Sequence, residues 1–140
     1  MLITNHVVSG ALVGAAAPGP VTAFVAGIAS HFALDSLPHW GDESKFLPVA
    51  VVDGLVGLTA MGIIAARTPK PRRTRVVAGM LGACAPDADK PGDLFFGRSP
   101  YPLVVDDWHR GIQRESPRRM PQEFAVAAAG ALLLRAFRVV

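Results

Sequence analysis

The feature that most constrains this chain is an apolar stretch from Phe46 to Ala66 that contains one charged residue, Asp53. A helix rises about 1.5 Å per residue, so this stretch is long enough to cross the ~30 Å hydrocarbon layer of a membrane. Of the 140 residues, 51% are hydrophobic and 18% are charged. Such a composition excludes a disordered chain, and the single cysteine, Cys84, excludes a disulfide-stapled one. We therefore expect a helical protein in a cell membrane.

The other apolar runs are rich in Ala, Leu and Gly and lack the strict alternation of strands, so they also predict helices. We expect an all-α fold that forms one domain over residues 1–140. It would be an up-and-down bundle of about five helices, over residues 5–17, 20–37, 46–66, 74–86 and 121–138. The third and fifth helices are expected to span the membrane. The segment at about 87–120 is rich in Pro, Gly and charge and predicts a long irregular loop. Small residues such as Gly10 and Gly79 would let helices approach closely.

An up-and-down path would bring all four histidines and most acidic residues to one end of the bundle. His31 and Asp35 are one helical turn apart, so they share a face and can point at one ion. A carboxylate inside a membrane helix costs about 2.5–3.5 kcal/mol, which a shared cation would offset. We therefore predict a divalent metal site with five ligands: His6, His31, Asp35, His39 and Asp87. Imidazole and carboxylate together favour zinc, with manganese or iron as alternatives.

Four further residues are candidates for catalysis at this site. Asp89 or Asp53 could act as a general base or orient a ligand histidine. His109 could be a general acid or a further ligand, and the Arg110 guanidinium suits a phosphate oxygen.

Each of these residues alone also has an ordinary structural explanation. His31 and Asp35 could form a plain ion pair, and Asp53 could hydrogen-bond to a neighbouring helix. The pair Asp87 and Asp89 could belong to a simple turn. The conjunction of all of them at one end favours a site.

Four short segments resemble the membrane-bound metal-dependent hydrolases, which include the LexA-regulated inner-membrane hydrolase family. They are Asn5-His6, the run from Ser30 to His39, Pro86-Asp87-Ala88-Asp89, and Trp108-His109-Arg110-Gly111. The resemblance, which extends distantly to the all-α zinc-dependent phospholipase C, implies an inner-membrane protein with a cluster of His and Asp ligands. Lys90 and Arg114 stand where that family has histidines.

The leading hypothesis is a membrane-embedded hydrolase that uses metal-activated water on a phosphate ester or a lipid or isoprenoid phosphate. Its expected partners are membrane lipids and a lipid-like or phosphorylated small molecule. The alternative is a non-catalytic small membrane protein with a structural or metal-binding His/Asp cluster, which Lys90 and Arg114 favour. Nucleic acid is not an expected partner, since the net charge of +3 comes with no visible nucleic-acid-binding fold. A homo-oligomer stays open.

Overall fold

The computed structural model describes residues 1–140 and is built almost entirely from helices, which confirms the all-α prediction. In chain order these are α1 (Ile3–Ala16), α2 (Pro20–Asp35), α3 (Phe46–Arg67), α4 (Lys70–Cys84), α5 (Asp89–Phe96), α6 (Leu103–Ile112) and α7 (Met120–Ala136). Short 3₁₀ turns lie at Glu43–Lys45 (η1), Ala85–Ala88 (η2) and Pro117–Arg119 (η3). The strands β1 (Pro38–His39) and β2 (Arg114–Glu115) form one short parallel pair.

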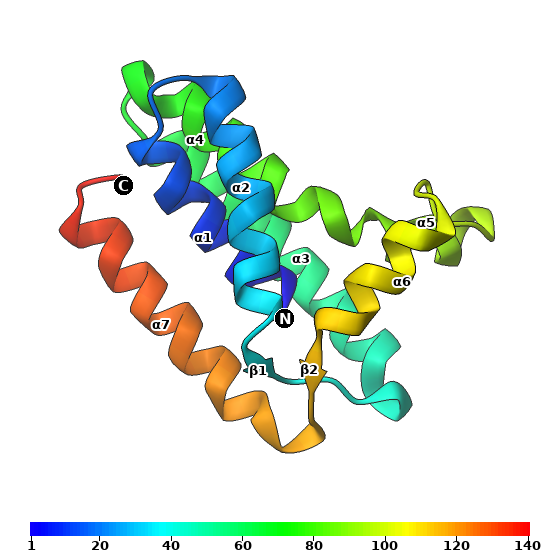
Figure 1. Cartoon of the computed structure of the whole chain (residues 1–140). Helices are drawn as coiled ribbons and strands as arrows, with labels where there is room; N and C mark the ends of the chain where they lie inside the picture. The colour runs from blue at the N-terminus through cyan, green and yellow to red at the C-terminus, as the bar shows by residue number, and fades with distance from the viewer.

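Helices α1, α2 and α4 pack side by side with their backbones in direct contact (Figure 1). A Cβ atom on Gly79 of α4 would lie 2.2 Å from the carbonyl oxygen of Gly10 in α1. A Cβ on Gly27 of α2 would lie 2.2 Å from the carbonyl oxygen of Gly79. Only glycine fits between helices this close, so the small residues set the spacing of the bundle, as the sequence predicts. Gly54 of α3 has no such neighbour.

The apolar core lies where α1 meets α3, α4 and α7. Met80 and Val76 of α4 pack there with Val7 and Ala11 of α1, and Leu134 reaches the same cluster from α7. Helix α7 runs along one flank of the bundle (Figure 1) and contributes little else to the core.

The region predicted as one irregular loop instead contains two helices, α5 and α6, which extend from the bundle as an arm (Figure 1). Pro102 precedes α6, and Gly97 ends α5 with a left-handed backbone, φ +67°. Pro102 and Gly97 therefore delimit short helices rather than prevent them, while Pro91 and Gly92 lie within α5 itself.

A second difference concerns the start of α4. The sequence predicts a helix that begins only at Thr74, after a basic loop, yet α4 begins at Lys70. Pro71 lies in the first helical turn, where its missing N–H has no intrahelical partner to lose. The basic residues therefore belong to the helix itself.

The prediction of at least two membrane-spanning helices is wrong. Only the segment Glu43–Arg67 is long and apolar enough to cross a membrane, and 11% of its most apolar window is buried. The last helix ends at Ala136 and carries Glu123 and Arg135, so it is too short and too polar to qualify. Most of α3 presents its apolar side chains outward, including Val52, Leu55 and Leu58.

Candidate metal centre

Four side chains from three segments converge at the end of α2. His31 and Asp35 share one face of that helix, and His31 Nε2 lies 3.1 Å from Asp35 Oδ2. His109 of α6 brings its Nε2 to 3.0 Å from both Asp35 Oδ2 and His31 Nε2. Asp87 of η2 places Oδ1 at 3.9 Å from His31 Nε2. One ligand atom from each of the four lies within 4.8 Å of the others, which confirms the predicted His/Asp cluster.

The orientation of His31 is fixed by the end of α4. Its Nδ1 lies 2.7 Å from the carbonyl oxygen of Ala83, one of the last carbonyls of that helix. A carbonyl only accepts, so Nδ1 carries a proton. Nε2 is the nitrogen that faces the carboxylate of Asp35 and the Nε2 of His109. Such an arrangement requires a proton or a cation between the atoms.

His6 of α1 stacks on His31, with ring centroids 3.9 Å apart. Its Nε2 lies 3.2 Å from Asp35 Oδ1 and 4.0 Å from Asp87 Oδ2. The side chain is fully buried, yet neither ring nitrogen makes a hydrogen bond. Burial lowers the pKa of His6 to about 4, so the ring is neutral at physiological pH and can offer a lone pair.

The two carboxylates link His6 with His31. One oxygen of Asp35 faces His31 and His109, and the other faces His6. Asp87 repeats this pattern, with Oδ1 toward His31 and Oδ2 toward His6. Burial opposes ionisation of Asp35, but the contacts with the imidazole nitrogens outweigh it, so its pKa lies well below the ordinary value.

Three nitrogens of other groups also contact the carboxylates. The amino nitrogen of Met1 lies 2.7 Å from Asp35 Oδ1. Gln113 Nε2 lies 3.3 Å from Asp35 Oδ2, and the ammonium group of Lys90 contacts Asp87 Oδ1. Lys90 therefore places a positive charge beside the cluster, where the resemblance leads one to expect a histidine.

The donor set fits a divalent ion. Zinc binds histidine nitrogen and carboxylate oxygen at about 2.0–2.2 Å, so neighbouring ligand atoms around a tetrahedral zinc lie about 3.3 Å apart. The three distances among His31, His109 and Asp35 are 3.0, 3.1 and 3.0 Å, close to that edge length. The unpartnered, buried Nε2 of His6 offers a further ligand. The arrangement could therefore hold one divalent ion.

The structure does not bring His39 to this group. Its Nδ1 lies 2.8 Å from the carbonyl oxygen of Leu37, and its Nε2 lies 3.8 Å from Glu115 Oε1. The reason is Pro38, which ends the helical register after α2 and starts β1. The pairing of His39 with Glu115 in β2 instead holds the end of α6 beside the end of α2.

Of the four catalytic candidates, only His109 joins the cluster. Asp53 accepts hydrogen bonds from the N–H groups of Ile3 and Thr4, at 2.5 and 3.3 Å, and so caps the start of α1. Asp89 Oδ1 accepts from the N–H group of Lys90 at 2.8 Å.

Arg110 lies on the outer side of α6. It forms an ion pair with Asp107, and both side chains are about two-thirds exposed, at 66% and 69%. Its guanidinium is therefore engaged at the surface, away from the buried cluster.

Sequence reasoning missed Glu123 of α7, which is buried and accepts three hydrogen bonds. Its donors are the N–H group of Leu2 at 3.1 Å, Asn5 Nδ2 at 2.7 Å and the N–H group of Trp40 at 3.0 Å. Its only sequence signal is an acid inside an apolar run. It also missed Asp106, which is buried and accepts from Ser99.

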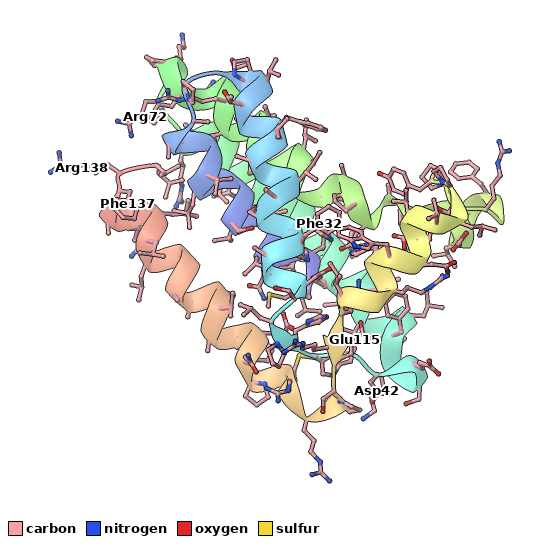
Figure 2. All side chains as sticks on the ribbon, in the orientation of Figure 1. Phe32, Asp42, Arg72, Glu115, Phe137 and Arg138 are labelled. Atoms are coloured by element: carbon pink, nitrogen blue, oxygen red, sulfur yellow. The ribbon has the colours of Figure 1, made fainter.

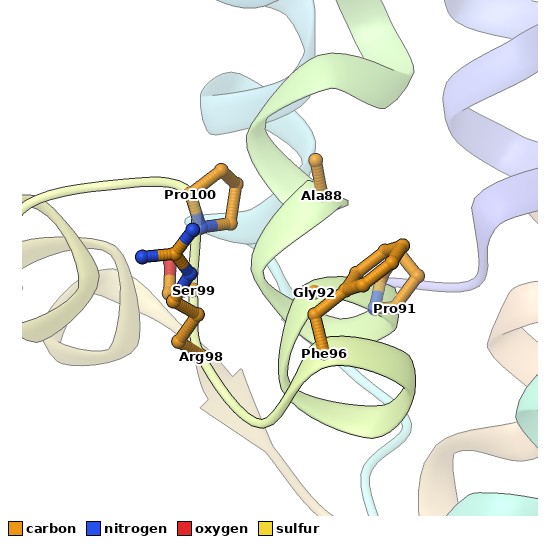
Figure 3. A pocket seen from close by; sticks show the side chains of 7 residues that line it. All are labelled: Ala88, Pro91, Gly92, Phe96, Arg98, Ser99 and Pro100. Atoms are coloured by element: carbon orange, nitrogen blue, oxygen red, sulfur yellow. The ribbon is translucent and has the colours of Figure 1, made fainter.

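The structure has two hollows, of which one borders the cluster. One is lined mainly by apolar side chains, among them Ile28, Phe32 and Val105, and reaches His109. Figure 2 shows Phe32 at the junction of α2 with α6. The other lies between α5 and the turn that follows it, and is lined by Phe96 and Arg98 among others (Figure 3).

Comparison with known proteins gives no match: no protein family, curated protein or solved structure is significantly similar to this chain.

Proposed function

We propose that this chain is a membrane-associated, metal-dependent hydrolase. The observation that carries the proposal is the convergence of two imidazoles and two carboxylates, those of His31, His109, Asp35 and Asp87, within 4.8 Å. Three of them are 3% exposed or less, and the side chain of Asp87 is 11% exposed. Buried groups of this kind need a counter-charge, and a divalent ion supplies it at a single point.

The four residues of the cluster would hold the ion, with His6 as a further ligand. Zinc is the favoured metal, and manganese or iron are alternatives. When bound, such an ion lowers the pKa of water toward ~7 and polarises a phosphoryl or acyl oxygen. The carbonyl of Ala83 keeps His31 in the tautomer that presents Nε2. Gln113 Nε2 lies 3.1 Å from His109 Nε2 and would have to give way to the ion.

The surroundings of the cluster support an ester or phosphate with an apolar chain as substrate. The hollow that reaches His109 is lined by Ile28, Phe32 and Val105, which suit a hydrocarbon segment. The exposed apolar length of α3 supports a location at a membrane, where such a molecule would be found. In this proposal Asp89 and Arg110 act on substrate only after a local rearrangement, because both are now engaged elsewhere.

A specific observation favours the second candidate, a non-catalytic protein with a metal-binding or structural cluster. The ammonium group of Lys90 contacts Asp87 Oδ1 and lies 3.8 Å from Asp89. It engages the same oxygen of Asp87 that faces His31, and it supplies a positive charge there without a metal. In this alternative the cluster ties α2, η2 and α6 together, and no turnover is expected.

Metal content of the detergent-purified full chain is the first test. The hydrolase and the metal-binding form of the second candidate both predict stoichiometric zinc, manganese or iron in the wild type. His31→Ala and Asp35→Ala should each lose it, because each removes an inner contact of the cluster. His39→Asn is the matched control, since His39 is equally buried but outside the group, and it should keep its metal. Metal-free wild-type protein after purification without chelator would refute the hydrolase.

Turnover separates the two candidates. The metal-loaded wild type should hydrolyse a phosphate ester that carries an alkyl chain, and chelation should abolish the activity. Val105→Trp would fill the hollow beside His109 and should impair long-chain esters more than short ones. Full metal loading without turnover of either substrate would instead support the non-catalytic alternative.

A further inference from the structure

The α5–α6 arm presents large apolar side chains to the outside. Phe95 and Phe96 at the end of α5 are 72% and 80% exposed, and Leu103 and Val104 at the start of α6 are 76% and 73% exposed. Isolated exposed hydrophobic residues are common on proteins, but four large ones on two successive short helices are typical of an interaction surface.

Helix α6 divides its residues between two faces. Asp106 and His109 point inward and are buried, while Val104 and Trp108, one turn apart, are exposed. The Trp108 ring packs edge-on against Phe32 of α2, with centroids 4.7 Å apart, and still exposes 52% of its surface. This contact with Phe32 therefore fixes the exposed face of α6 relative to His109, the residue that follows Trp108 in the helix.

The length of the two helices in the arm and the arginine between them indicate which partner would cover its exposed apolar residues. Eight residues in α5 and ten in α6 are too few to cross a bilayer, which needs about 20 residues. Arg98, in the turn between the helices, is exposed and makes no ion pair, so its guanidinium is free for an anion. Arg98 and Phe96 both line the hollow of Figure 3, which they face from different sides. Aromatic rings with a neighbouring arginine are typical of segments that lie in the headgroup region of a membrane.

We propose that the α5–α6 arm is a membrane-interface anchor that lies on a phospholipid surface. Phe95, Phe96, Leu103 and Val104 enter the outer part of the acyl region, and Arg98 meets headgroup phosphates. Trp108 then sits at the boundary between headgroups and chains. Since His109 is its neighbour on the inward face, the anchor places the metal cluster at the depth of a lipid headgroup. This surface does not depend on whether the cluster binds metal or catalyses.

Trp108 itself can report on the anchor, because the only other tryptophan, Trp40, is 7% exposed. The full chain with Trp40→Phe would be reconstituted in phosphatidylcholine vesicles brominated either near the headgroup or near the chain end. We expect strong loss of Trp108 fluorescence with the shallow label and weaker loss with the deep one. Trp108→Phe, which keeps only Trp40, should show little loss with either. Circular dichroism would establish that both variants fold.

A paired substitution sharpens the test. Phe96→Ser should reduce the quenching of Trp108 by the shallow label, because it weakens the anchor beside it. Phe137→Ser, at an exposed phenylalanine of similar exposure (64%) beyond α7, should leave it unchanged. Fluorescence of Trp108 that is insensitive to both brominated lipids would overturn the proposal. Acrylamide, a water-soluble quencher, would then show what surrounds the ring instead. Quenching by acrylamide would place Trp108 in open solvent, and protection from it would place Trp108 against a second copy of the chain; either result overturns the proposal.

Discussion

Asp35 and Glu123 are both buried carboxylates near the first turns of α1, yet their surroundings differ. Glu123 receives hydrogen bonds from two backbone N–H groups and the Asn5 amide, all of which are fixed donors. Asp35 faces three imidazoles, whose Nε2 atoms lie 3.0–3.2 Å away. Backbone donors satisfy an acid completely and hold no metal, whereas imidazole nitrogens can present lone pairs. The comparison shows how a structural acid differs from a ligand acid within one small bundle.

The largest expected effect is on metal binding, and it comes from changing a partner of the ligand acid Asp35. His31→Ala should abolish metal binding, because the ring contacts two of the other three donors, His109 and Asp35, at 3.0 and 3.1 Å. Affinity should fall by more than the roughly 10–100-fold that loss of an outer partner costs. Metal titration of the apoprotein measures this, together with the loss of the metal-dependent rise in Tm. An unchanged affinity would remove the distinction between the two acids.

Glu123→Ala tests the structural acid. Two buried donors and the half-buried N–H group of Leu2 would lose their partner. At about 1–3 kcal/mol for each buried donor, the free energy of unfolding should fall by about 2 kcal/mol or more. Denaturation in detergent measures the loss, and metal stoichiometry in the folded fraction should stay unchanged. Loss of the metal in correctly folded Glu123→Ala would show that the two acids act as one site.

Asp53→Ala should have a smaller effect of the same kind. Asp53 caps the start of α1 from a neighbouring helix, and loss of a helix cap costs about 0.5–2 kcal/mol. The readout is again the unfolding free energy, with metal content as the control. The prediction of Asp53 as a catalytic residue would be revived if turnover fell while stability held.

Arg110→Ala should have the smallest effect on folding. Its ion pair with Asp107 is exposed, and such surface pairs contribute less than about 1 kcal/mol. Metal affinity and Tm should match those of the wild type. If the chain is a hydrolase and Arg110 still meets the substrate, KM for a phosphate ester should rise in this variant alone.

Sequence reasoning could predict the all-α fold and the pair His31 and Asp35, because helical spacing alone puts them on one face. It placed Asp87 with them because an up-and-down path returns α4 to the same end. It could not place His39, because one proline redirects the chain after α2. Nor could it separate Asp53 from the cluster, since a capping acid and a ligand acid look alike in a sequence.

The α5–α6 region shows a different limit. Prolines and glycines lower the intrinsic tendency to form helix, so local composition predicts a loop there. Short helices form nonetheless: Gly97 and Pro102 fall at helix ends, and α5 accommodates Pro91 and Gly92 within its length. The apolar residues between them carry too little periodicity over eight or ten positions to be recognised beforehand.

The glycine contacts between α1, α2 and α4 have a consequence for the cluster that these helices hold. Where main chains touch, no side-chain rotamer can adjust the gap, so the separation of His6 from His31 is set by the peptide backbone itself. The distances between the ligand side chains are thus fixed before any ion binds. Metal binding therefore requires little rearrangement of the protein. Gly79→Ala would widen that gap from the inside, and would loosen a site it never touches.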